Sequence, residues 1–177
     1  MRTLKPSEVV YIGGRAGVGK TTVAAEISHI LRDAGVPHAV IEGDNLDQAY
    51  PEPWRNGMPL AERNLAAMWH NYHEAGYRRL IYTNTVSVLE MANLNEAIGG
   101  EVRATGVLLG AEDKTAALRL AGREIGSDLE AHVERSNRAG ERLEQSAPEE
   151  VHRVATDART VTEVARTIIG LTKWTLI

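Results

Sequence analysis

The sequence predicts an α/β fold in which a five-stranded parallel sheet carries helices on both faces, giving three layers. Short apolar, β-branched runs alternate with segments of helical periodicity along the 177 residues. The first run ends in a glycine-rich loop with a single lysine, and later runs end in polar or acidic residues. Because the carboxyl ends of parallel strands border one crevice, these residues should converge on a single site.

Three strands and two helices are expected in the first half of the chain. Residues 9–12 form a short β-branched run that ends at two glycines, which is typical of a buried parallel strand. Apolar residues of the next segment share one helix face, and Gly35 stands where a helix usually ends. The expected elements are a strand at 9–12, a helix ending at Gly35, a strand at 38–41, a loop at 45–59, a helix at 60–75 and a strand at 80–82.

Two more strands are expected in the second half. Thr160 and Glu163 have the spacing of a capping box, in which each side chain accepts a hydrogen bond from the other residue's backbone, so a helix should begin there. The expected elements are a helix at 86–98, a strand at 102–109, a helical segment at 112–144 with possible breaks at Gly122, Gly126 and Gly140, a strand at 153–156 and a helix from Thr160 to about residue 171.

The glycine-rich loop carries the clearest functional signal. Residues 14–21 match the phosphate-binding pattern G-x-x-x-x-G-K-[ST] between a predicted strand and a predicted helix, as the motif requires. Glycine allows the tight backbone that directs successive N–H groups at phosphates. Lys20 is compact enough to reach the β- and γ-phosphates, and the Thr21 hydroxyl can bind Mg²⁺. We therefore expect ATP and Mg²⁺ as cofactors. The nucleotide-binding residues expected here are Gly14, Arg15, Ala16, Gly17, Val18, Gly19, Lys20, Thr21 and Thr22.

The rest of the sequence narrows the class of P-loop protein. GTPases read the base with an Asn-Lys-x-Asp pattern, and this chain contains no Asn-Lys pair. Large ATPases need a longer chain and a strand that ends in acidic residues, whereas the third expected strand here is followed by Thr83, Asn84 and Thr85. The remaining class of P-loop protein is the small phosphotransferases, which use an acidic residue after the second strand.

Two carboxylates follow the second expected strand. Glu42 and Asp44 are two residues apart, so on a strand both would lie on the same side. Asp44 can accept the proton of a substrate hydroxyl or orient that group, and Glu42 can hold a water molecule on Mg²⁺. The alternative is that Asp44 or Asp47 only caps the next segment. We predict Asp44 as catalytic and substrate-binding, Asp47 as substrate-binding, and Thr21 and Glu42 as the metal site.

Several motifs together resemble a known group of kinases. The phosphate-binding loop, the run Ile-Glu-Gly-Asp-Asn at 41–45, Arg63-Asn64 and Gly76 before a strand resemble adenylylsulfate kinases. The latter half is similar to shikimate-, gluconate- and chloramphenicol-phosphotransferase-like kinases. The resemblance implies a P-loop fold like that of nucleoside-monophosphate kinases with a helical lid, ATP·Mg²⁺ as donor and a small alcohol as acceptor. Glu42 stands where adenylylsulfate kinases have Asp, and the chain has no Phe, so the acceptor should differ from adenylylsulfate.

The resemblance also implies roles for individual arginines. Arg123, and with it Arg119, matches the arginines of a lid at about 119–138, where a cation that closes over the phosphates would neutralise transition-state charge. The alternative is a solvated helix face on which acidic neighbours pair with these arginines. By the same resemblance the catalytic residues are Lys20, Asp44 and Arg123, and Arg119 and Arg159 join the nucleotide-binding set, Arg159 from the loop along the adenine.

Segment 45–77 is the expected acceptor-binding region. It holds most of the aromatic residues of the chain, and Trp54 lies in a proline-rich loop where its ring could cover a planar or sugar-like substrate. Asn84 follows the third strand and could bind polar groups of the acceptor, or instead cap a helix. The predicted substrate-binding residues are Asp44, Asp47, Trp54, Arg63 and Asn84.

Composition limits the remaining possibilities. The net charge of −4 supplies no broad basic face for nucleic acid, the chain has no Cys, and no apolar run is long enough to span a membrane. We expect one cytoplasmic domain over 1–177, as a monomer or homodimer. The leading hypothesis is a kinase that phosphorylates a hydroxyl of a metabolite or antibiotic. A nucleoside or nucleotide kinase, or a non-catalytic ATP-binding sensor, remains open.

Overall fold

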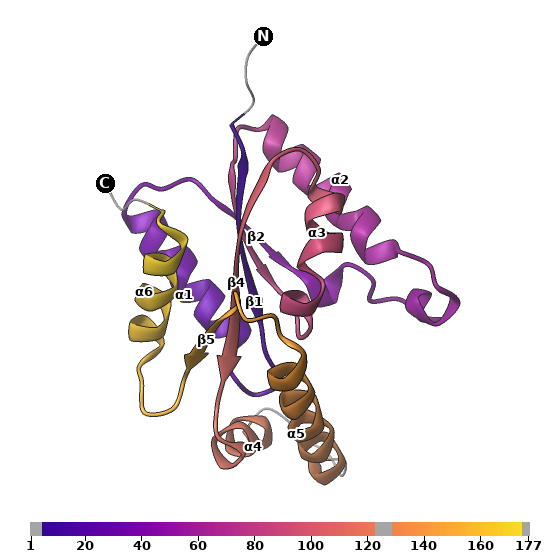
Figure 1. Cartoon of the computed structure of the whole chain (residues 1–177), viewed down its shortest axis with the longest axis vertical. Coiled ribbons are helices and arrows are strands. Elements are labelled where there is room, and N and C mark those ends of the chain that lie inside the picture. The colour runs from indigo at the N-terminus through magenta and orange to yellow at the C-terminus, as the bar shows by residue number, and fades with distance from the viewer. Residues whose placement is uncertain (1–4, 123–128, 175–177) are drawn as a thin grey trace.

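The central sheet follows the predicted α/β plan. The computed structural model describes residues 5–122 and 129–174. Its strands are β1 (Ser7–Gly13), β2 (Ala39–Glu42), β3 (Arg79–Thr83), β4 (Val102–Gly110) and β5 (His152–Ala155). They form one sheet in the order β2-β3-β1-β4-β5, and every neighbouring pair is parallel (Figure 1). The predicted five-stranded parallel sheet is therefore confirmed, with β1 at its centre.

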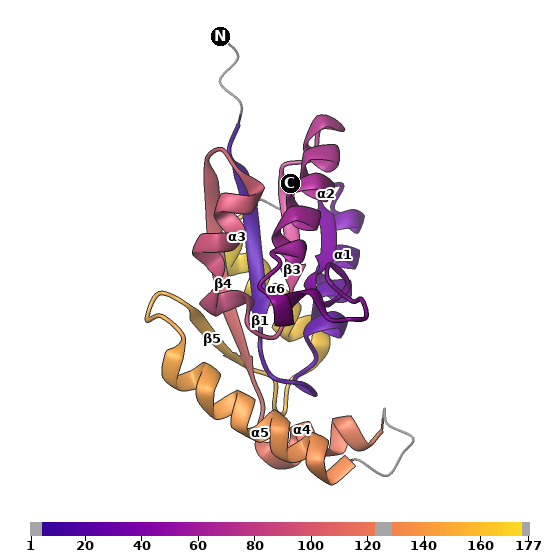
Figure 2. The same cartoon turned by 90° about the vertical axis from the view of Figure 1, so that its right-hand side faces the viewer.

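Helices cover both faces of the sheet because alternate residues of β1 are apolar on both sides. The helices are α1 (Lys20–Asp33), α2 (Leu60–Glu74), α3 (Met91–Ile98), α4 (Asp113–Ala121), α5 (Leu129–Ser146) and α6 (Val161–Thr172). Val10 and Ile12 pack in one core cluster with α1 and α6, and Val9 and Tyr11 pack in another with α2 and α3. The helices α4 and α5 lie at the carboxyl ends of the strands (Figure 2).

Both predicted helix ends are confirmed by their hydrogen bonds. Gly35 has φ +68° and donates its N–H to the Arg32 carbonyl, while Val36 donates to Leu31, so α1 ends in a Schellman turn. At the start of α6 the Thr160 hydroxyl accepts from the Glu163 N–H and the Glu163 carboxylate accepts from the Thr160 N–H.

Across the described ranges 5–122 and 129–174, no helix has the length and apolar character needed to cross a membrane.

Three elements differ from the sequence prediction. The helix expected at 86–98 is split into a 3-10 turn, η3 (Ser87–Leu89), and α3. One 3-10 turn, η1 (Gly43–Asn45), leads into the segment expected as loop at 45–59, and a second, η2 (Pro53–Asn56), lies inside it. Segment 112–144 divides at Gly122, whereas Gly140 lies inside an unbroken α5 because it makes room for a neighbouring side chain. The predicted break at Gly126 and the predicted catalytic residue Arg123 lie outside the described residues.

Candidate functional site

The phosphate-binding loop joins β1 to α1 and turns on glycines with positive φ. Gly14, Gly17 and Gly19 have φ of +143°, +85° and +97°, a backbone region that other residues rarely adopt. A Cβ on Gly17 would lie 2.6 Å from the Ala116 carbonyl oxygen, so the loop also packs directly against α4. No side chain caps α1 at Gly19, so the first N–H groups of the helix point out of its N-terminus, as an anion site needs.

Lys20 and Thr21 begin α1 at the mouth of this loop. The Lys20 Nζ donates to the carbonyl oxygens of Gly14 at 2.7 Å and Arg15 at 3.3 Å, which holds the ammonium group across the loop. The Thr21 hydroxyl donates to Glu42 Oε1 at 2.9 Å, at the end of β2. The two residues predicted as the metal site are therefore neighbours. Thr22 is exposed on the same helical turn.

Asp44 lies near this pair, but its position differs from the prediction. The expectation that Glu42 and Asp44 share one side of a strand is wrong, because β2 ends at Glu42 and Asp44 lies in η1. Gly43 makes that turn possible, since a Cβ there would lie 2.4 Å from the Tyr82 hydroxyl. Asn84, after β3, donates from Nδ2 to Asp44 Oδ1 at 2.9 Å. The structure thus brings two predicted substrate-binding residues together.

The surroundings of Asp44 are acidic. Desolvation raises the pKa of Asp44; Lys20 opposes this rise, and Glu42 and Asp47 add to it. Glu90 has a raised pKa as well, from desolvation and from its acidic neighbours, which include Asp47. The carboxyl groups of Asp44 and Glu90 therefore hold protons more tightly than exposed carboxyl groups do.

A cavity adjoins the phosphate-binding loop beside Val18 and Gly19. Arg119 of α4 donates to the Val18 carbonyl at 3.3 Å and to the Thr156 hydroxyl at 2.9 Å. Arg159 is held by the Ala155 carbonyl at 3.3 Å and by Thr167 Oγ1 at 2.7 Å. The cavity between them has a volume of about 250 Å³ and is lined by several predicted nucleotide-binding residues: Val18, Gly19, Thr22, Arg119 and Arg159, with Val23, Thr156, Val161 and Val164.

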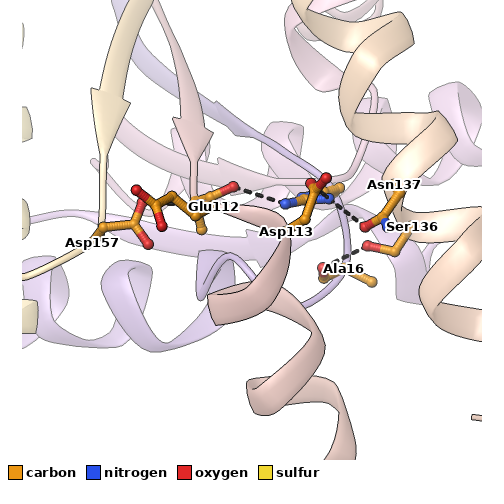
Figure 3. Close-up of polar contacts among 8 residues, drawn as sticks. Ala16, Glu112, Asp113, Ser136, Asn137 and Asp157 are labelled. Carbon is orange, nitrogen blue, oxygen red and sulfur yellow. Dashed lines mark hydrogen bonds and ion pairs between the residues drawn. The ribbon is translucent and has the colours of Figure 1, made fainter.

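The α4 helix is anchored beside this cavity by Asp157. Its Oδ2 accepts a hydrogen bond from the Glu112 N–H at 3.0 Å, at the start of α4 (Figure 3). Desolvation would raise the pKa of Asp157, but hydrogen bonds from Thr115 and Glu112, with the charge of Arg119, outweigh it and lower the pKa. An ionised Asp157 at the N-terminus of α4 also complements the helix dipole.

Other predicted substrate residues lie apart from these contacts. Trp54 is exposed in η2 and its ring is covered by Arg55, whose guanidinium carbon is 5.2 Å from the ring centroid. Arg63 is exposed on α2. Its neighbour Asn64 donates from Nδ2 to the Leu46 carbonyl at 2.5 Å, which ties the segment holding Asp47 to α2.

Arg15 and Ala16 make contacts that sequence reasoning missed. The Arg15 side chain is buried among residues of α4 and α5, and the Ala16 carbonyl accepts from the Ser136 hydroxyl of α5 at 2.9 Å (Figure 3). The only sequence signal was a charged residue inside a loop of small residues. Ser136 and Thr156 gave none, because single hydroxyl residues on a charged helix or after a short strand have no pattern of their own.

Comparisons with known proteins agree with this architecture. A model of the adenylylsulphate kinase family matches residues 6–52, which include the phosphate-binding loop and η1. No curated protein matches the chain in sequence. Among solved structures, the tunicamycin resistance protein of Deinococcus radiodurans is similar with a TM-score of 0.64 and 20% identity, over 96% of this chain and 97% of that one.

Two solved kinases are similar as well. The APS kinase of Mycobacterium tuberculosis, solved with AMPPNP and APS, has a TM-score of 0.56 and 22% identity over 94% of this chain and 98% of its own. The gluconokinase of Sinorhizobium meliloti 1021 has a TM-score of 0.58 and 19% identity over 97% and 93%. The resemblance read from the sequence motifs is thereby confirmed, and the chain has the fold of the small P-loop kinases.

Proposed function

We propose that this chain is an ATP-dependent phosphotransferase that moves the γ-phosphoryl group of ATP to a hydroxyl group of a small molecule. The observation that carries the proposal is the convergence of three pieces of chemistry at the carboxyl ends of β1, β2 and β3. These are the Lys20 ammonium group in its glycine loop, the Thr21–Glu42 pair and the Asp44–Asn84 pair. The kinases among the structural neighbours support the same reaction type.

Each of these groups fits one requirement of phosphoryl transfer. The loop N–H groups and Lys20 would bind the phosphates and stabilise charge on the transferred group. Asp44 would orient the acceptor hydroxyl and take its proton, while the hydrogen bond from Asn84 fixes the carboxylate. Because the pKa of Asp44 is raised, its ionised form is a stronger base than an exposed aspartate. Arg119 and Arg159 would line the site of the adenine.

The donor atoms near the loop suit Mg²⁺. A hydroxyl and a carboxylate are hard oxygen ligands, and Thr21 Oγ1 and Glu42 Oε1 are 2.9 Å apart. Mg²⁺ keeps several water molecules and binds substrate phosphates, so few protein ligands are needed. A bound Mg²⁺ would neutralise charge on the β- and γ-phosphates. Thr21 would ligate the ion directly, and Glu42 would hold one of its water molecules.

The proposal is tested by ADP release from ATP·Mg²⁺ with a panel of hydroxyl compounds. The panel contains sugar acids, nucleosides, adenylylsulfate and hydroxyl-bearing antibiotics, with Lys20→Ala as the blank. We expect ADP release that depends on one class of acceptor and is absent from the blank. Nucleosides as the only active class would favour the nucleoside kinase alternative. ADP release equal to the blank on every acceptor would refute the proposal, and ATP binding together with that result would favour a sensor.

A further inference from the structure

Arg15 is a charged residue inside a loop whose other members are small or apolar, and its side chain is buried. Only 5% of its surface is exposed. A guanidinium group loses much hydration in such a place, so it must be held by hydrogen bonds and a counter-charge. Its backbone belongs to the phosphate-binding loop, but its side chain is engaged elsewhere.

Three different elements hold the guanidinium group. Nη1 lies 2.7 Å from Asp113 Oδ1 in α4 and donates to Asn137 Oδ1 in α5 at 2.7 Å, and Nη2 donates to the Ala111 carbonyl after β4 at 2.7 Å. Figure 3 shows Asp113 and Asn137 approaching from their two helices. These directions match the fixed fork of a guanidinium group, which an ammonium group lacks.

Two further contacts fasten the same loop to the same helices. Ser136 of α5 donates to the Ala16 carbonyl at 2.9 Å, beside Arg15 in the chain. Gly140, one turn after Ser136, has no side chain, and a Cβ there would lie 2.8 Å from Arg15 Cδ. The α5 helix therefore packs directly on the stem of the arginine.

The α4 side of this arrangement adjoins the cavity lined by Val18, Arg119 and Arg159. The α4 helix that pairs with Arg15 through Asp113 also carries Arg119, which contacts Val18 and Thr156. Direct polar contacts thus join the loop to α4 and α5, through Arg15 and Ala16 at one end of the loop and through Val18 at the other. Movement of the loop backbone would have to break these contacts or move the two helices with it.

We infer that Arg15 is a positioning residue that couples the phosphate-binding loop to α4 and α5. Its guanidinium group fixes the loop in the shape that presents its N–H groups, and phosphate binding in turn stabilises α5. This inference rests on the proposed nucleotide site but needs no acceptor and no catalysis. It predicts that α5, outside the expected phosphate contacts, responds to nucleotide only while Arg15 is present.

The test is hydrogen exchange of the full chain with and without AMPPNP·Mg²⁺, together with the AMPPNP affinity. We expect AMPPNP to slow amide exchange in both α1 and α5 of the wild type. In Arg15→Ala, affinity should fall about 10-fold, since a hydrogen-bonded buried charge is lost. At saturating AMPPNP, protection of α1 should persist and protection of α5 should disappear. Arg15→Lys should show the same fall in AMPPNP affinity and the same loss of α5 protection, because lysine keeps the charge but lacks the fixed geometry of the guanidinium group.

Two more variants separate coupling from general damage. Arg153→Ala is the control, because Arg153 bonds to Glu144 of α5 and to the carbonyls of Pro148, Val151 and Ala147, all at the C-terminal end of α5, and not to the phosphate-binding loop. It should keep wild-type affinity and α5 protection. Ser136→Ala removes only the neighbouring contact and should weaken α5 protection in part, so it serves if Arg15→Ala does not fold.

The outcomes distinguish the two proposals. Wild-type affinity in Arg15→Ala, or α5 protection that survives there, would refute the coupling and leave the kinase proposal intact. AMPPNP binding that leaves wild-type α5 exchange unchanged would do the same. No AMPPNP binding by the wild type would refute the nucleotide site itself and the coupling with it.

Discussion

Alanine substitutions at two helical glycines give opposite predictions for stability. Gly140 lies inside α5, and Gly170 lies in the last turn of α6. Glycine inside a helix costs roughly 0.5–1 kcal/mol relative to alanine, so each substitution gains about this much from helix propensity. A Cβ at Gly170 would meet no atom within 4 Å. We therefore expect Gly170→Ala to raise the free energy of unfolding by that amount.

At Gly140 a packing penalty outweighs the same gain. The added Cβ would lie 2.8 Å from Arg15 Cδ and 3.3 Å from Nε, closer than carbon atoms tolerate. Arg15 cannot swing aside freely, because three partners hold its guanidinium group at 2.7 Å. Overpacking of this kind costs about 1–3 kcal/mol. The Gly140→Ala variant should be less stable than the wild type, and less stable than Gly170→Ala by about 1–3 kcal/mol.

Urea unfolding followed by circular dichroism measures both variants. The slopes of the two unfolding curves should match that of the wild type, so that the midpoints report stability directly. AMPPNP affinity should fall in Gly140→Ala and stay unchanged in Gly170→Ala, since only the first disturbs Arg15. Equal stabilisation by both substitutions would show that Arg15 yields without cost, and would refute the rigid packing of the loop on α5.

Asp44→Asn keeps the shape of the side chain and its hydrogen bond with Asn84 but loses the basic group. Turnover in the ADP-release assay should therefore fall about 10²–10⁴-fold, while AMPPNP affinity stays unchanged. Asp33→Asn, on the exposed end of α1, is the matched control. The raised pKa of Asp44 should also move the acidic fall of wild-type activity to higher pH than for an exposed aspartate. Because the raised pKa makes ionisation of Asp44 costly in the folded state, the contribution of this carboxyl group to the free energy of unfolding is lost as pH rises through its folded-state pKa. Asp44→Asn should therefore be at least as stable as the wild type at pH 7. Thr21→Ala should raise the Mg²⁺ concentration for half-maximal activity several-fold without unfolding the protein, and an unchanged Mg²⁺ dependence would contradict the assigned ligand. Thr160→Ala removes the cap of α6 and should lower Tm by roughly 2–4 °C in a thermal scan, with no loss of AMPPNP affinity.

The fold was predictable because its signals are local. β-branched runs, a glycine loop and the Thr160–Glu163 capping box each depend on neighbours in sequence, and all correspond to elements of the structure. The same reasoning failed where a contact partner lies far along the chain. Gly140 is a helix breaker by propensity but a helix residue here, because it faces an arginine 125 positions earlier.

The candidate site was predictable in its chemistry and less so in its geometry. Lys20, Thr21 and Glu42 lie together because the strand ends of a parallel sheet converge. The turn that carries Asp44 depends on the close approach of Gly43 in η1 to Tyr82 in β3, which no spacing in the sequence encodes. The position of the Arg15 side chain likewise depends on α4 and α5, which begin 98 and 114 residues later.

The sheet order has a consequence for synthesis on the ribosome. The first strand to leave the exit tunnel, β1, is the middle strand, and its partners β3 and β4 follow more than 60 and 90 residues later. Nascent chains therefore carry the phosphate-binding sequence long before they carry the strands and helices that shape it. Contacts between such distant segments form slowly. Under the proposed coupling, nucleotide would bind more tightly once α5 is complete, so ATP in the cell would stabilise finished molecules more than growing ones.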